Sequence, residues 1–82
     1  MDSEIRTVLA THARLATPID AVGDHTDLYE AGMTSHASVT VMLAIEDTFD
    51  IEFPERLLRK ATFSSVAAIR EAVAQLTTAA PA

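Results

Sequence analysis

The spacing of apolar residues along the chain predicts helices rather than strands. Near the N-terminus, Ser3 can cap a helix that Thr17-Pro18 ends, because the residue before a proline avoids the helical region. The apolar residues of this segment recur at roughly helical spacing: Ile5, Val8, Leu9 and Leu15. No stretch shows the alternation of apolar and polar residues that is typical of a half-buried strand. We therefore expect an all-α fold.

Between residues 18 and 34 the helical pattern stops. Asp, Thr, Gly and Pro interrupt this stretch. A connection of such length is unusual in a compact domain unless it is functional or internally structured. We expect Leu28 and Tyr29 to attach it to the core.

The clearest predicted helix follows this loop. The run from His36 to Phe49 contains neither Gly nor Pro, and Asp50 is expected to end the helix. Its expected apolar stripe, interrupted by Glu46 and broadened by Val41 and Ile45, consists of Val39, Met42, Leu43 and Phe49.

Two further helices are expected in the last third of the chain. Pro54 can open a short helix over residues 55–60. Thr62 is the expected cap of a last helix that runs to about residue 76, and its apolar stripe consists of Val66, Ile69, Val73 and Leu76. Residues 77–82 are expected to fray. The pattern predicts one domain over residues 1–82, a four-helix bundle with a long first loop and a short third helix.

Composition narrows the functional classes. The 82 residues include 6 Lys+Arg and 12 Asp+Glu, a net charge of −6, which argues against non-specific nucleic-acid binding and against attraction to an anionic membrane. No apolar stretch approaches the roughly 20 residues of a membrane-spanning helix, and no signal peptide is evident. We expect a monomeric cytoplasmic domain.

The acidic residues are concentrated in the middle of the chain. No Lys or Arg occurs between Leu15 and Glu55, whereas nine acids do. Such a segment is commonly a solvated surface, and it could also attract a basic partner. An unmodified helical protein-interaction module is therefore one hypothesis for this chain.

The residue types give little support to a metal site or to catalysis. The chain has no Cys, and its histidines are too scattered for a helical ligand pair: His12, His25 and His36. The acids of the loop lack the Asp-x-Asp-x-Asp-Gly pattern of a calcium site. Adjacency alone does not make Ser35 and His36 a nucleophile–base pair, and so small a core leaves little room for a deep cleft. We expect no metal and no enzyme activity.

Ser35 allows two interpretations. It could be a helix N-cap, which contributes about 1 kcal/mol. Alternatively, its hydroxyl could be presented for covalent modification, since free N–H groups at a helix start favour an anion such as a phosphoester. Gly32, three residues earlier, permits a turn with positive φ.

A family resemblance favours the second interpretation. Residues 27–35, Asp-Leu-Tyr-Glu-Ala-Gly-Met-Thr-Ser, resemble the Asp-Leu-x-x-x-Gly-x-x-Ser signature of the acyl carrier protein family. Residues 49–54 look like its Phe-Asp-x-Glu-Ile-Pro pattern, and the similarity spans residues 4–76. It implies a non-catalytic carrier whose Ser35 receives 4′-phosphopantetheine from coenzyme A through a phosphopantetheinyl transferase. The thiol of this arm would hold an acyl or aminoacyl thioester. Ser38 is the weaker candidate because it breaks the Gly-to-Ser spacing.

Departures from the family pattern point to a subgroup. Thr34-Ser35-His36 replaces the usual Asp-Ser-Leu, and residues 32–39 look more like small bacterial aminoacyl carrier proteins. This resemblance implies loading with a small amino acid, such as glycine or alanine, by an amino acid:[carrier protein] ligase related to seryl-tRNA synthetases. A downstream enzyme would accept the group. The ligase would dock on the second helix, with this expected partner surface: Thr34, His36, Ala37, Val39, Thr40 and Glu46. An acyl carrier for specialised fatty-acid, polyketide or peptide biosynthesis is the alternative within the family.

Overall fold

The computed structural model describes residues 2–78, and this part of the chain forms helices and no strand. The α-helices are α1 (Asp2–His12), α2 (Ser35–Phe49) and α3 (Val66–Thr78). Three short 3₁₀ turns accompany them: η1 (Ile19–Ala21), η2 (Glu55–Leu57) and η3 (Lys60–Phe63). The prediction of an all-α fold is confirmed.

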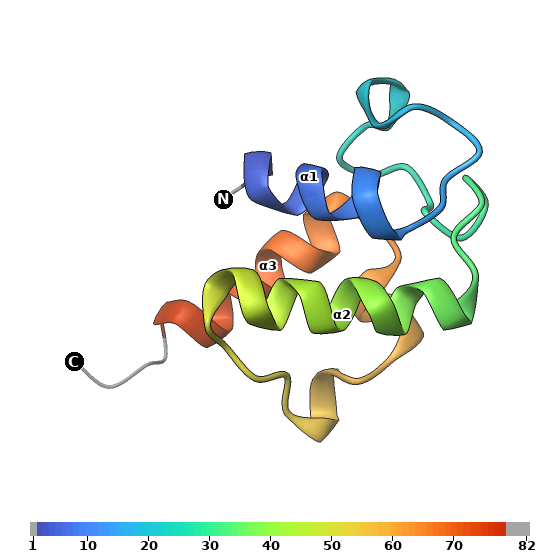
Figure 1. The fold of residues 1–82 in the computed structure, drawn as a ribbon. Helices are drawn as coiled ribbons and strands as arrows, with labels where there is room; N and C mark the ends of the chain where they lie inside the picture. The colour runs from blue at the N-terminus through green and yellow to red at the C-terminus, as the bar shows by residue number, and fades with distance from the viewer. Residues whose placement is uncertain (1, 79–82) are drawn as a thin grey trace.

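Helix α1 packs against both α2 and α3. The turn η3 also contacts both α2 and α3. Figure 1 shows that α1 and α2 run in opposite directions. The start of α2 therefore lies at one end of the molecule, while the start of α1 and the last turn of α3 lie toward the other end. None of the helices in residues 2–78 has the length and apolar character needed to cross a bilayer.

The core combines side chains from the three α-helices with three buried side chains from the long loop: Val22, Leu28 and Met33. Leu28 and Met33 are 0% and 2% exposed, and Tyr29 is half-buried against the same cluster, so the predicted attachment of the loop is confirmed. The largest fully buried side chains in the helices are Ile5, Leu9, Val41, Ile45, Val66, Ile69 and Val73. Phe53 and Phe63 close the core with an edge-to-face contact at 5.3 Å between ring centroids.

The expected third helix over residues 55–60 is not an α-helix. The segment instead contains η2 and the start of η3, and η2 is held by bonds from Leu57 N–H to Pro54 O (2.9 Å) and from Leu58 N–H to Glu55 O (3.0 Å). Arg59 then adopts extended backbone angles, with φ −133° and ψ 154°, so the helical path stops. Three α-helices, rather than four, are present in residues 2–78.

The predicted helix ends also differ at several places. Helix α1 begins at Asp2, so Ser3 lies inside it, and it ends at His12 rather than near Thr17. Two residues after α1, Arg14 has a left-handed backbone with φ 56°, so the helix cannot continue through it.

The start and end of α3 lie later than expected. Thr62 lies within η3, and Ser65 takes the capping role, since its Oγ accepts a hydrogen bond from Ala68 N–H at 3.1 Å. Helix α3 extends through Thr78, past the expected start of fraying at residue 77. Residues 79–82 of that tail lie outside the described residues.

Two arginines attach the long loop to the helices. Arg6 of α1 donates to Val22 O at 2.6 Å and to Asp24 Oδ1 at 2.9 Å, and Arg70 of α3 donates to Asp24 Oδ2 at 3.3 Å. The pKa of Asp24 lies below its ordinary value, chiefly because of the hydrogen bond from Arg6 and then that from Arg70. Backbone bonds reinforce the attachment, with Leu28 N–H donating to Ser64 O at 2.8 Å.

Candidate functional site

The end of the long loop is an ordered turn built by Asp27 and Leu28. Asp27 Oδ1 accepts hydrogen bonds from the N–H groups of Tyr29 (2.9 Å) and Glu30 (3.3 Å). The Leu28 side chain is fully buried beneath this turn. An Asp side chain therefore organises the backbone while its neighbour anchors it, which directs the chain toward the start of α2.

Gly32 is required by the shape of this turn. Its φ is 121°, which an L side chain rarely adopts, and a Cβ at this position would lie 2.8 Å from Ala16 N. The two backbone segments are held close together because Ala16 N–H donates to Ala31 O at 2.8 Å. The predicted positive φ at Gly32 is confirmed.

Thr34, rather than Ser35, is the N-cap of α2. Its Oγ1 accepts a hydrogen bond from Ala37 N–H at 3.0 Å, and its backbone is extended, as an N-cap requires. Ser35 is the first residue of the helix, and its side chain is exposed. Within residues 2–78, no group forms a hydrogen bond with the Ser35 hydroxyl. This hydroxyl is accessible, and it stabilises no other part of residues 2–78 through a hydrogen bond.

Ser38 is in a different situation. It is half-buried, and its Oγ donates a hydrogen bond of 2.6 Å to the carbonyl oxygen of Ser35. The hydroxyl of Ser38 is therefore satisfied locally. Of the two serines, Ser35 is the one with a free and exposed hydroxyl.

A groove of about 400 Å³ runs beside Ser35, between α2 and the segment that contains η2 and η3. Its walls are largely apolar, with two cationic side chains, and its described lining residues are Tyr29, Ser35, Ser38, Val39, Met42, Leu58, Arg59, Lys60 and Phe63. Lys60 Nζ lies 4.8 Å from the centroid of the Tyr29 ring, a cation–π contact.

The structure divides the expected partner surface into two groups. Four of its residues have exposed side chains: Thr34, His36, Val39 and Thr40. Ala37 is only 4% exposed, because it packs into the core. Glu46 is half-buried, and its Oε2 accepts a hydrogen bond from Phe53 N–H at 2.8 Å, so it holds the segment after α2.

The expected apolar stripe of α2 is wrong in part. Val39 and Leu43 are 52% and 56% exposed, and the residues that face the core are Ala37, Val41 and Ile45. These three residues also recur at helical spacing, so the sequence contains two apolar stripes on one helix. The buried stripe includes a small alanine, which made it the less conspicuous of the two. Leu43, which was expected on the apolar stripe, is instead an exposed apolar residue.

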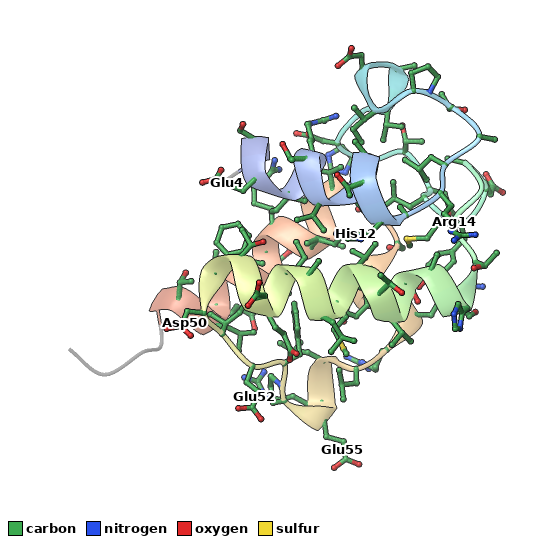
Figure 2. All side chains as sticks on the ribbon, in the orientation of Figure 1. Glu4, His12, Arg14, Asp50, Glu52 and Glu55 are labelled. Carbon is green, nitrogen blue, oxygen red and sulfur yellow. The ribbon has the colours of Figure 1, made fainter. Side chains whose placement is uncertain are left out.

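Three of the nine acids in the middle of the chain lie away from Ser35. Figure 2 shows Asp50, Glu52 and Glu55 at the far end of α2 and in the turn that follows it, away from the start of this helix. Among the described residues, no three His, Cys, Asp or Glu side chains are grouped closely enough to hold a metal ion.

Comparison with known families assigns the class of the chain. Residues 3–78 match the family described as "Phosphopantetheine attachment site". The chain therefore belongs to this family of carrier domains, in which phosphopantetheine is bound covalently. The resemblance to carrier proteins noted in the sequence is confirmed.

Individual relatives are aminoacyl carriers and partners of a ligase. The chain is 49% identical over 73 residues to the aminoacyl carrier protein of Agrobacterium fabrum, an alignment that covers 89% of this chain and 88% of the relative. Its structure is similar to that of the Agrobacterium tumefaciens carrier protein complexed with engineered Bradyrhizobium japonicum glycine:[carrier protein] ligase and AMP. This match has a TM-score of 0.87 and 49% identity, and it covers 89% of this chain and 97% of the other.

A second, more distant match involves a loaded carrier. It is a structure of Bradyrhizobium japonicum glycine:[carrier protein] ligase complexed with glycylated carrier protein, with a TM-score of 0.74 and 25% identity. The aligned region covers 87% of this chain and 95% of that chain.

Proposed function

We propose that this protein carries an aminoacyl group as a thioester on 4′-phosphopantetheine attached to Ser35 Oγ. The observation that carries the assignment to Ser35 is the exposed, unbonded hydroxyl at the first residue of α2. Because Thr34 supplies the cap, modification of Ser35 costs the helix no hydrogen bond. The 4′-phosphopantetheine arm would supply the thiol that the Cys-free chain lacks.

Attachment needs a transferase, because no base among residues 2–78 forms a hydrogen bond with the Ser35 hydroxyl. The Ser35 oxygen would form a bond to the phosphorus next to the pantetheine half of coenzyme A. The nucleotide half would leave, and the hydroxyl proton would pass to a base on the transferase. The product phosphodiester would lie at the start of α2, where the first N–H groups of a helix have no partner within it and favour an anion.

Loading is proposed to occur through an amino acid:[carrier protein] ligase that docks on α2. Support comes from the 49% identical relative named as an aminoacyl carrier and from the similar carriers complexed with glycine:[carrier protein] ligase. The exposed side of α2 near Ser35 offers polar and apolar side chains to such an enzyme: Thr34, His36, Val39, Thr40 and Leu43. Ala37 is not part of this surface because its side chain is buried. A small amino acid is the proposed cargo.

Intact mass spectrometry tests the attachment. After incubation with coenzyme A and a broad-specificity phosphopantetheinyl transferase, the wild-type chain should gain the mass of one phosphopantetheinyl group. Ser35→Ala should gain none, whereas the matched control Ser38→Ala should be modified like the wild type. Modification of Ser35→Ala, or its loss in Ser38→Ala alone, would contradict the assignment.

A loading assay tests the cargo. The modified protein is incubated with ATP, a single amino acid and glycine:[carrier protein] ligase, and the thioester is detected by mass and by its sensitivity to hydroxylamine. We expect glycine or alanine to be transferred. If only fatty acyl or malonyl groups can be loaded, by their own transferases, the aminoacyl function is wrong while the carrier function stands.

A further inference from the structure

The groove beside Ser35 begins at the attachment point. Ser35 itself forms part of its wall, next to the apolar side chains of Val39 and Met42. Given the proposed function, on which this inference rests, an arm bonded to Ser35 Oγ starts at the mouth of the groove. A volume of about 400 Å³ lies within the range of cavities that hold small molecules.

The charge of this groove has one sign. Arg59 and Lys60 line it, and no Asp or Glu is among its described lining residues. Lys60 is held in place from two directions, since its ammonium lies on the Tyr29 ring and its carbonyl oxygen accepts a hydrogen bond from Tyr29 Oη at 3.3 Å. The contact with the Tyr29 ring places the Lys60 ammonium at the wall of the groove, and Arg59 adds a second positive charge to the same wall.

An aminoacyl group differs from a simple acyl group by a positive charge. At neutral pH most of its α-amino groups are protonated, since the pKa of such an amine is about 8. A glycyl group and a propionyl group have nearly the same size and shape, but the glycyl group ends in an ammonium where the propionyl group ends in a methyl. Apolar walls favour the methyl, and the cations of Arg59 and Lys60 repel the ammonium.

We infer that the groove is a charge filter that accepts the arm when its end is neutral and excludes it when the end is an aminoacyl cation. The aminoacyl cargo is therefore presented to solvent, where an acceptor enzyme can reach it, while a neutral acyl cargo lies against Val39, Met42 and Phe63. Two like charges about 4 Å apart in water change an equilibrium about fivefold, so a difference of this order in groove occupancy is expected.

The experiment compares the two isosteric cargoes on the full chain. Propionyl and glycyl forms of the arm are attached to Ser35 with amide links in place of the thioester, which prevents hydrolysis. Backbone ¹⁵N–¹H spectra then report shifts at Val39, Met42 and Phe63 relative to the protein with the unloaded arm. We expect the propionyl arm to shift these resonances, and the glycyl arm to shift them about fivefold less.

Charge neutralisation distinguishes repulsion from poor fit. In R59Q/K60Q, shifts caused by the glycyl arm should rise toward those of the propionyl arm. The control R14Q/R56Q loses the same two positive charges at residues outside the described lining of the groove and should behave like the wild type.

Each other outcome overturns the inference. Equal shifts for both cargoes in the wild type, no change in R59Q/K60Q, or no shift for either cargo would show that the groove does not filter the arm by charge. In these cases the mass of the modified protein still supports the proposed function. A chain that cannot be modified at Ser35 would instead refute the proposed function and this inference together.

Discussion

Thr34 and Ala37 close the first turn of α2 through a hydrogen bond of 3.0 Å from Ala37 N–H to Thr34 Oγ1. The residue that holds the helix start and the residue proposed to carry the prosthetic group are therefore neighbours with separate tasks. In many helices a serine at such a junction would itself be the cap. Here the serine is one position further along, where its oxygen is available for a covalent bond.

This separation predicts opposite effects of two neighbouring substitutions. Thr34→Ala should lower the free energy of unfolding by about 1 kcal/mol, because the cap is lost. Ser35→Ala should change it by less than about 0.5 kcal/mol, since an exposed side chain without a partner is removed. Urea denaturation followed by circular dichroism measures both. A larger loss in Ser35→Ala than in Thr34→Ala would contradict the assignment of the cap.

Gly32 should tolerate a methyl group poorly. Gly32→Ala combines a φ of 121° with a Cβ placed 2.8 Å from Ala16 N, and backbone strain of this kind costs about 1–3 kcal/mol. The matched control is Gly23→Ala, whose Cβ would meet Thr26 Oγ1 at an ordinary 3.4 Å. Thermal unfolding should show a large loss in Gly32→Ala and a small change in Gly23→Ala; similar values for both would refute the steric argument.

Asp24 should make the stability of the protein depend on acid pH. Because the arginines lower the pKa of Asp24 in the folded state, its contribution is complete above the unfolded value of about 3.8 and is lost as the pH falls through the lower folded pKa. Asp24→Asn should therefore lower the melting temperature at pH 7, and the gap from wild type should shrink below about pH 4.

The control for this experiment is Asp20→Asn, in the same loop. Asp20 is exposed and lies in η1, so its removal changes the net charge equally without breaking the contacts of Arg6 and Arg70. A pH profile of Asp20→Asn that matches that of Asp24→Asn would assign the effect to overall charge instead.

The two apolar faces of α2 should respond differently to truncation. Ile45 is fully buried, so Ile45→Ala should cost about 2–5 kcal/mol of stability. Leu43 is 56% exposed, so Leu43→Ala should change stability by less than about 1 kcal/mol while slowing loading by the ligase. Urea denaturation and the loading assay measure the two effects. Normal loading kinetics in Leu43→Ala would remove this residue from the proposed docking surface.

Much of the fold was predictable because local signals agreed with one another. Helix α2 extends to Phe49 and Asp50 ends it, as expected, and the backbone of Asp50 is left-handed with φ 53°. Leu28 and Gly32 were identifiable because burial of a loop leucine and positive φ at a glycine each follow from residue type and context. The proposed role of Ser35 follows from the resemblance of residues 27–35, and of most of the chain, to the carrier-protein pattern rather than from the serine itself.

What was not predictable depended on tertiary contacts. Periodicity could not decide which of two apolar stripes on α2 faces the core, because Val39 and Leu43 are as apolar as Val41 and Ile45. The packing of α2 against α1 and η3 selects the stripe that contains Ala37. In the same way, residues 55–60 have helix-forming residue types, and the extended backbone at Arg59 interrupts them.

The positions of the helix ends determine where a tag or a solid support can be attached without covering Ser35. Ser35 begins α2 at one end of the molecule, whereas Asp2 and the last turn of α3 lie toward the other. A tag, a solid support or a fused domain joined at either side of residues 2–78 would therefore leave the end of the molecule that contains Ser35 unobstructed. The chain is suited to immobilisation through its ends, with the exposed Ser35 directed into solution.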